Sequence, residues 1–182
     1  TSGWQNSDLV IIAARPAMGK TAFVLSMAKN IAVDFKIPVA IFSLEMSNVQ
    51  LVNRLIMNVC EIEGSKIRNG KLSQAEWLKL DEKISELREA PIYVDDTPGL
   101  SVFELRSKAR KLVNDKDKGV KLIIIDYLQL MNANGSNFGS REQEVSIISR
   151  TLKGMAKELN IPVIALAQLS RAVEKRDASN NT

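Results

Sequence analysis

The feature of this sequence that most constrains its fold is a loop of small residues between an apolar run and a helical pattern. The apolar run covers Leu9–Ala13, and the eight residues after it read Ala-Arg-Pro-Ala-Met-Gly-Lys-Thr. A strand that leads through such a loop into a helix presents successive N–H groups and the positive end of the helix to one anion. The pattern therefore predicts a phosphate-binding loop inside an α/β fold.

Two side chains at the end of this loop suit a magnesium nucleotide. Lys20 adds a positive charge that reaches the outer phosphates, and the Thr21 hydroxyl suits a Mg²⁺ ligand. The usual pattern has glycine where this chain has Ala14, and alanine disfavours a strictly positive φ. Gly-Lys-Thr is also a common turn or helix start, but the strand before it and the helix after it favour nucleotide binding. The residues expected to line the nucleotide are Arg15, Pro16, Ala17, Met18, Gly19, Lys20, Thr21 and Ala22.

The composition excludes several classes of chemistry. The 182 residues are enough for one full core, with 45% hydrophobic residues and a net charge of +4. Cys60 is the only cysteine and histidine is absent, which excludes a disulfide framework, zinc sites and acid–base catalysis by histidine. The sequence has no signal peptide and no apolar run of spanning length, so we expect a cytoplasmic protein without a membrane partner.

Apolar runs alternate with helical patterns in the order expected of successive strand–helix–strand units. Strands are expected over residues 9–14, 39–44, 91–94, 122–125 and 162–167, and helices over residues 20–34, 49–60 and 142–159. Two further helices are expected after Ser73 and Ser101, because a glutamate follows each serine three residues later, as in a capping box. The predicted fold is a single α/β domain over residues 1–182, with a mostly parallel sheet flanked by helices on both faces.

Two carboxylates are candidates for the rest of a hydrolytic site. Asp126 follows four apolar residues of one predicted strand, and open α/β sheets bind ligands at the carboxyl ends of their strands. There Asp126 would hold Mg²⁺, although it could simply end the strand. Glu45 lies at the carboxyl end of the second predicted strand, where it could activate a water as a general base. It could equally interact with the dipole of the following helix.

Other polar residues give weaker signals. Gln168 ends the last predicted strand, where its amide could contact a γ-phosphate or merely form a turn. Asp95 and Asp96 resemble a paired-carboxylate site, but the Thr-Pro that follows them favours an Asx turn. Basic residues that could contact DNA phosphates, or simply form a solvated face, are Arg141, Arg171, Lys175 and Arg176.

Several segments together resemble one known family, the C-terminal motor domain of DnaB-type replicative DNA helicases. These segments are ARPAMGKT, IFSLEMS, DDTPGLS, IIIDYLQLM, REQEVSIISRTLKGMAKEL and IPVIALAQLSRAVEKR. The resemblance extends from Gly3 to Arg176, and the last two segments are far more specific than a phosphate loop. It implies a RecA-like core that assembles into a homo-hexameric ring, hydrolyses ATP with Mg²⁺ and moves along single-stranded DNA. Primase and a helicase loader are implied as partners.

The resemblance also implies roles for individual residues. Lys20 and Thr21 would bind phosphate and Mg²⁺, Asp126 would be the metal-associated acid, Glu45 the water-activating base and Gln168 the γ-phosphate sensor. Residues 132–144 would correspond to a loop that faces the central channel.

Compared with this family, we expect the chain to lack the N-terminal collar and the strands that follow the position of Arg176. Those strands carry basic finger residues that reach a neighbour's ATP, so we expect the chain to bind nucleotide but to hydrolyse it poorly. Three alternatives stay open: a RecA-type recombinase, a small-molecule P-loop kinase, and an assembly module that binds nucleotide without turnover.

Overall fold

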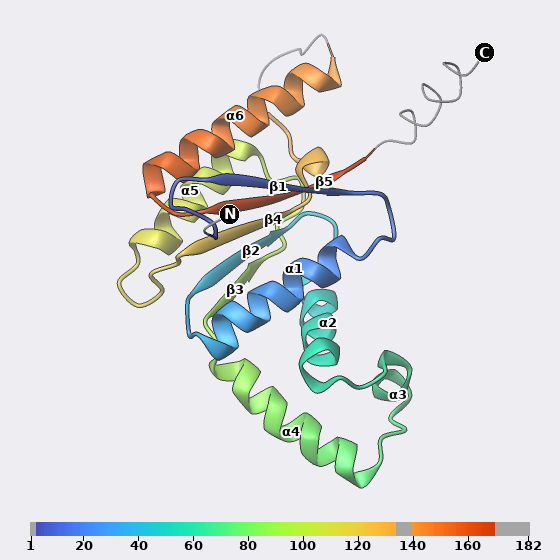
Figure 1. Cartoon of the computed structure of the whole chain (residues 1–182). Helices are drawn as coiled ribbons and strands as arrows, with labels where there is room; N and C mark the ends of the chain where they lie inside the picture. Colours follow the sequence, from blue (N-terminus) through green and yellow to red (C-terminus); the bar gives the residue numbers. More distant parts are fainter. Residues whose placement is uncertain (1–2, 134–139, 170–182) are drawn as a thin grey trace, which may run out of the picture.

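The structure is a computed structural model that describes residues 3–133 and 140–169. Its centre is a sheet of five parallel strands in the order β1-β5-β4-β2-β3 (Figure 1). The strands are β1 (Leu9–Ala14), β2 (Val39–Ser43), β3 (Ile92–Asp95), β4 (Leu122–Asp126) and β5 (Val163–Gln168). Because all strands run the same way, all their carboxyl ends lie at one edge of the sheet.

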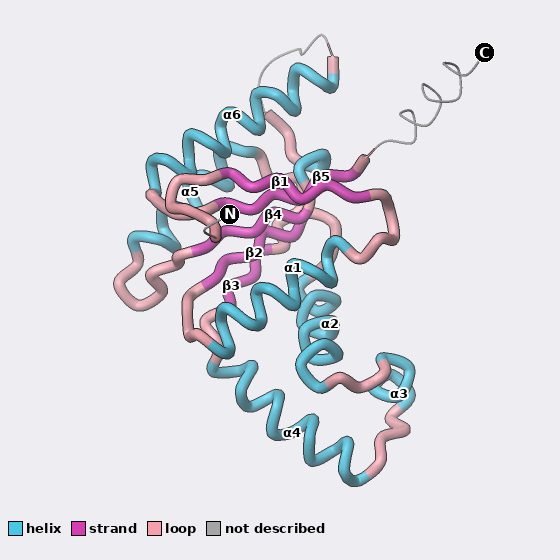
Figure 2. Tube along the Cα trace, in the orientation of Figure 1, coloured by secondary structure: helices cyan, strands magenta, loops and turns pink. Residues whose placement is uncertain are grey.

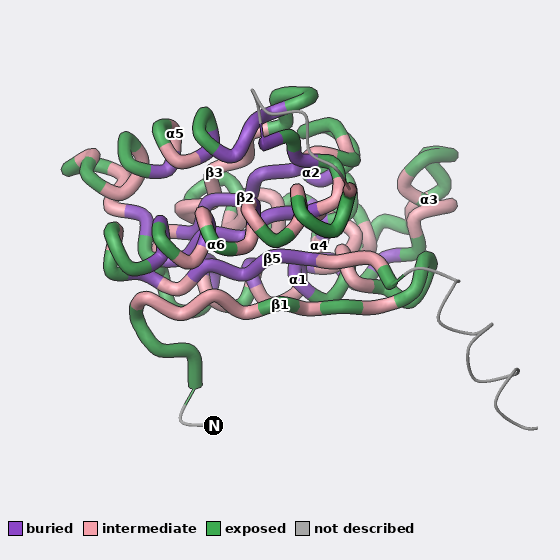
Figure 3. The backbone as a smooth tube through the Cα atoms, turned by 90° about the horizontal axis from the view of Figure 1, so that it is seen from above, coloured by how far each residue is buried: buried purple, intermediate pink, exposed green. Residues whose placement is uncertain are grey.

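The central strands β2 and β4 are apolar up to their last residues, Ser43 and Asp126, because both faces of the sheet are covered. All five residues of β2 and all five of β4 are buried. Successive side chains of β4 enter opposite cores: Ile123 and Ile125 belong to one cluster, Ile124 to the other. The edge strand β1 is less covered, as the mixed colours along it in Figure 3 show.

Two pairs of helices form the layers on either side of the sheet (Figures 1 and 2). On one face α5 (Val102–Asn114) and α6 (Arg141–Leu159) contribute Leu105, Leu152 and Met155 to the core. On the other face lie α1 (Lys20–Lys29) and α2 (Asn48–Cys60). This arrangement confirms the predicted α/β class with helices on both faces.

A further segment, here called the arm (residues 61–90), extends from this second layer (Figure 1). It contains α3 (Gly64–Asn69) and α4 (Gln74–Glu89). A small separate cluster of Cys60, Ile62 and Leu80 joins the arm to the end of α2. The predicted capping boxes are confirmed at the starts of α4 and α5.

The predicted elements differ from the observed ones in a few places. The helix expected over residues 20–34 is α-helical only to Lys29 and continues as a π-helical turn, η1 (Asn30–Asp34). The short helix α3 and the 3-10 turn η2 (Leu128–Leu130) were not predicted. No residue of α3 is buried, so the apolar periodicity that indicates a helix is absent there. Among the described residues, no helix is both long and apolar enough to cross a membrane.

Candidate nucleotide-binding site

The phosphate loop joins β1 to α1 at the carboxyl edge of the sheet. Gly19 has φ of 81° and Ala17 has φ of 62°, both in the left-handed region. Ala14 is instead the last residue of β1, where it pairs with Gln168. An extended residue does not need the conformational freedom of glycine, so alanine at this position leaves the loop intact.

The N-terminus of α1 is left open for an anion. The serines Ser47, Ser73, Ser101 and Ser140 cap the N-termini of α2, α4, α5 and α6. Among the described helices of eight residues or more, α1 alone has no side-chain cap, and its first turn contains no acidic residue. Its first N–H groups are therefore available to a phosphate.

The Thr21 hydroxyl donates a hydrogen bond of 2.7 Å to Oδ2 of Asp126 at the end of β4. Asp126 is only 2% exposed, and its Oδ1 is buried with no hydrogen-bond partner among the described residues. Burial raises the pKa of Asp126, while the bond from Thr21 and the charges of Lys20 and Arg54 act in the opposite direction. The peptide bond between Asp126 and Tyr127 is cis.

These two side chains fit the magnesium site predicted from the sequence. Mg²⁺ is usually bound through one or two side-chain oxygens together with substrate phosphates and waters. Thr21 and Asp126 provide such a pair, and the unpartnered Oδ1 is an oxygen that a cation or its water would satisfy. In the described part of the chain no group of three or more His, Cys, Asp or Glu residues is placed to hold a metal ion.

Glu45 lies two residues beyond the end of β2, in a bend that Ser43 stabilises. The Ser43 hydroxyl donates to the carbonyl of Met46 at 2.7 Å and accepts from its N–H at 3.2 Å. Ser43 is opposite Asp126 in the sheet register, so both acids lie at the same edge. Two N–H groups in the first turn of α2 already have acceptors, in the side chains of Ser47 and Asp96. This supports Glu45 as a general base rather than as a partner of the α2 dipole.

A pocket of about 370 Å³ collects the predicted site residues. It is lined by Arg15, Pro16, Ala17, Met18, Gly19, Lys20, Thr21, Ala22, Glu45, Met46, Arg54 and Gln168. Asp126 lies beneath it, in contact with Thr21. The fold therefore brings the whole predicted nucleotide-binding set together with Glu45 and Gln168.

Sequence reasoning missed Arg54, which reaches this pocket from α2. The positive charge of Arg54 acts to lower the pKa of Asp126. Within residues 3–133 and 140–169, Arg54 makes no hydrogen bond or ion pair. A guanidinium matches phosphate geometry well. The only available signal was that Arg54 is the single charged residue of a helix that buries Leu51 and Leu55.

Lys20 has a protein partner in this structure. Its Nζ donates to the carbonyl of Ala167 at 3.2 Å and lies 5.1 Å from the centre of the Tyr127 ring. The next residue, Gln168, ends β5, and its backbone N–H and carbonyl both bond to the side chain of Gln129.

Comparison with known proteins places this arrangement in a family. The family model for the DnaB-like helicase C terminal domain matches residues 1–181. The chain belongs to the DnaB-like helicase C-terminal domain family. It is 55% identical over 176 residues to the replicative DNA helicase DnaB of Nostoc sp. and 51% identical to that of Geobacillus stearothermophilus. These alignments cover 97% of this chain but only 20% and 38% of the two relatives.

Solved structures agree with this DnaB-family fold. The chain matches a DnaB-like replicative helicase, solved in a study of its interactions with primase, with a TM-score of 0.87 and 41% identity. That alignment covers 95% of this chain and 41% of the other. A second solved structure, of an ATPase domain, matches with the same TM-score and identity, over 95% of this chain and 61% of the other. The RecA-like fold is thereby confirmed.

The paired acids Asp95 and Asp96 have separate structural roles in this DnaB-family domain. Asp95 Oδ1 accepts from the N–H of Thr97 at 3.0 Å, which is the expected Asx turn, and its Oδ2 accepts from Lys108 at 2.6 Å. Asp96 accepts from the N–H of Asn48 at 2.7 Å. Each carboxylate is thus occupied within the fold.

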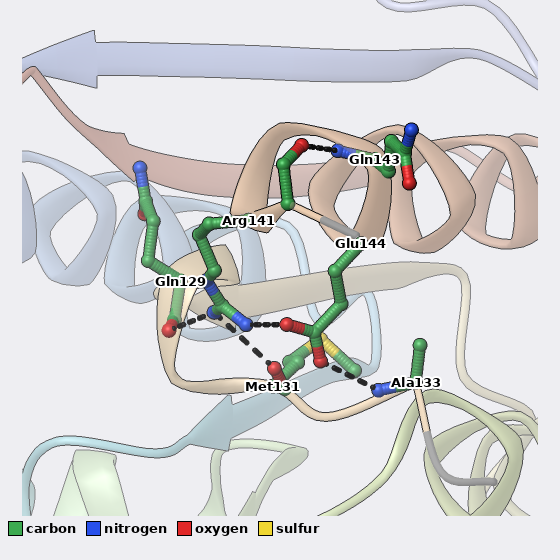
Figure 4. Close-up of polar contacts among 7 residues, drawn as sticks. Gln129, Met131, Ala133, Arg141, Gln143 and Glu144 are labelled. Atoms are coloured by element: carbon green, nitrogen blue, oxygen red, sulfur yellow. Dashed lines mark hydrogen bonds and ion pairs between the residues drawn. The ribbon is translucent and has the colours of Figure 1, made fainter. Parts of the chain in front are cut away.

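Arg141 is the one candidate DNA contact inside the described residues. Its guanidinium bonds to Glu144 and to the carbonyls of Gln129 and Met131 (Figure 4). Glu144 also accepts from the N–H of Ala133 at 3.2 Å. The other candidates, Arg171, Lys175 and Arg176, lie outside the described residues, as do residues 134–139 of the expected channel loop.

Proposed function

We propose that this chain is the ATP-hydrolysing motor domain of a replicative DNA helicase. The observation that carries the proposal is the Thr21–Asp126 hydrogen bond, set between the uncapped N-terminus of α1 and the acid Glu45. That combination supplies groups for a phosphate, a metal and a water at one sheet edge. Membership in the DnaB-like family supports the same function.

In this proposal the loop residues and Lys20 bind the triphosphate. Lys20 exchanges its bond to the Ala167 carbonyl for the outer phosphates, and Arg54 adds a second positive charge from α2. Thr21 and Asp126 would hold Mg²⁺, which when bound neutralises phosphate charge and orients the leaving group.

Glu45 accepts a proton from the attacking water. The water oxygen forms a bond to the γ-phosphorus while the bond from that phosphorus to the β–γ bridging oxygen breaks. The products are ADP and inorganic phosphate. The amide of Gln168 contacts the γ-phosphate and so distinguishes ATP from ADP.

The partners follow from the same assignment. We propose single-stranded DNA as the track, a homo-hexamer as the working assembly, and primase and a helicase loader as further partners. The net charge of +4 suits contacts with a nucleic-acid backbone. A motor of chromosome replication would act in the cytoplasm, at the nucleoid.

The substitution Glu45→Gln tests the catalytic assignment. It removes the proton acceptor and keeps the shape of the side chain, so single-turnover ATP hydrolysis should fall by about 10²–10⁴-fold. Equilibrium binding of a fluorescent ATP analogue should stay unchanged. Phosphate release and fluorescence titration measure the two effects, with Glu89→Gln as a matched control at the exposed end of α4. Unchanged hydrolysis in Glu45→Gln would overturn the role of Glu45 as the base. Nucleotide binding with no hydrolysis in the wild-type chain would instead indicate a binding module without turnover.

A further inference from the structure

The side chain of Gln129 replaces a missing strand partner at the end of β5. The β4–β5 ladder runs from the pair Ile123–Val163 to the pair Ile125–Ala165 and stops there. On its other side, β5 stays paired with β1 as far as Gln168. The last residues of β5 therefore have a neighbouring strand on one side only.

The backbone groups of Gln168 face this unpaired side. Along β5, Val163 and Leu169 donate toward β1, while the carbonyl of Pro162 accepts from β4. The backbone N–H and carbonyl groups of successive residues in a strand point to opposite neighbouring strands. The even-numbered Gln168 therefore directs its N–H and carbonyl toward β4. Half-buried backbone groups of this kind need partners.

Gln129 supplies both partners from η2. Its Nε2 donates to the Gln168 carbonyl at 3.0 Å, and its Oε1 accepts from the Gln168 N–H at 3.2 Å. A primary amide offers one donor and one acceptor side by side, as a peptide group does. The two bonds together fix the position and the direction of the Gln168 backbone.

The backbone of Gln129 is itself held in place. Arg141 donates to its carbonyl while also bonding to Glu144 at the start of α6 (Figure 4). In this view the side chain of Gln129 points away from the Arg141–Glu144 pair. Gln129 thus bridges the start of α6 and the end of β5.

We infer that Gln129 is a positioning residue, which acts on nucleotide recognition by holding Gln168 at the phosphate pocket. This inference rests on the proposed function of Gln168 as the group that contacts the γ-phosphate. Without Gln129 the end of β5 keeps its pairing with β1 but loses its constraint on the β4 side. The side-chain amide of Gln168 is then no longer held in the orientation that contacts the γ-phosphate.

The test is the ratio of the ADP dissociation constant to the ATP dissociation constant. It is measured on the purified chain with Mg²⁺, using fluorescent ADP and a fluorescent, slowly hydrolysed ATP analogue. A hydrogen bond to a charged group is worth about tenfold in affinity, so Gln168→Ala should lower the preference for ATP by about tenfold. Gln129→Leu should lower it to a similar extent and leave ADP affinity unchanged. The double variant should show no further loss, because both substitutions remove the same contact, that of the Gln168 amide with the γ-phosphate.

Two further variants guard against a purely structural effect. Gln143→Leu alters a glutamine in the same region whose side chain makes no hydrogen bond among the described residues, and it should keep the wild-type preference. Gln129→Glu keeps the acceptor and loses the donor, so it should lower the preference in the same direction. Thermal unfolding of each variant checks that the fold is retained.

The outcomes separate the two proposals. If the wild-type chain does not bind the nucleotides, the proposed function fails. If Gln168→Ala lowers the preference for ATP while Gln129→Leu and Gln129→Glu keep it, Gln129 has no positioning role. Additive losses in the double variant, or a preference unchanged in Gln168→Ala, also overturn the inference.

Discussion

The central sheet and the arm are held by different forces. Every residue of β2 and β4 is buried between two helical layers. In the arm, α3 has no buried residue and α4 has only Leu80. Apolar burial thus stabilises the strands whose carboxyl ends form the nucleotide-binding site, whereas the arm is stabilised by local contacts.

The contacts of the arm are mostly exposed. Lys66 pairs with Glu76 at 2.7 Å, and Lys79 pairs with Glu61 at 3.3 Å. Exposed ion pairs contribute little to stability. An apolar groove of about 340 Å³ also lies between α2, α4 and β3. We therefore expect the arm to open locally at a lower free energy than the sheet.

The largest expected difference comes from truncating one leucine in each region. Leu152 is fully buried against the sheet, whereas Leu80 is 8% exposed in the small cluster. Buried leucine-to-alanine changes cost about 2–5 kcal/mol. We expect Leu152→Ala to lower the free energy of unfolding by about 4 kcal/mol and Leu80→Ala by about 2 kcal/mol. Urea unfolding measures both, and equal losses would contradict the comparison.

The helix caps give a smaller contrast. Ser101 caps α5 and is 1% exposed, and its Oγ also donates to Glu104 at 2.6 Å; Ser73 caps α4 at the surface. Ser101→Ala should cost about 1.5 kcal/mol and Ser73→Ala about 0.5 kcal/mol. Ser85→Ala, in the interior of α4, is the control and should be close to neutral. A greater loss at Ser73 than at Ser101 would show that the arm contributes more than its burial suggests.

The smallest expected effect is that of acid on the Lys66–Glu76 contact of the arm. The hydrogen bond from Lys66, together with those from Ser73, lowers the pKa of Glu76 from 4.5 to about 2. Because the folded pKa lies below the unfolded one, the stabilisation is present above about pH 4.5 and is lost as the pH falls toward 2. The difference in unfolding free energy between wild type and Glu76→Gln should therefore shrink between pH 6 and pH 2.5. A constant difference across this range would rule out the Glu76 contribution.

The sequence by itself determined the elements whose cause is local. The phosphate loop, the strands and the caps at Ser73 and Ser101 follow from residue spacing, because covered strands are apolar and helix N-termini need acceptors. Spacing did not predict α3, where nothing is buried. The residue types at positions 20, 21, 45, 126 and 168 were likewise enough to propose a nucleotide site.

Only the tertiary structure decided which of these groups meet and what else joins them. Thr21 and Asp126 are 105 positions apart, and Gln129 and Gln168 are 39 apart. Such pairs depend on the strand order, which separates β1 from β2 and places β5 and β4 between them. Arg54 reaches the pocket only because α2 packs beside α1. Residue spacing along a chain cannot predict these contacts, because the packing of distant segments creates them.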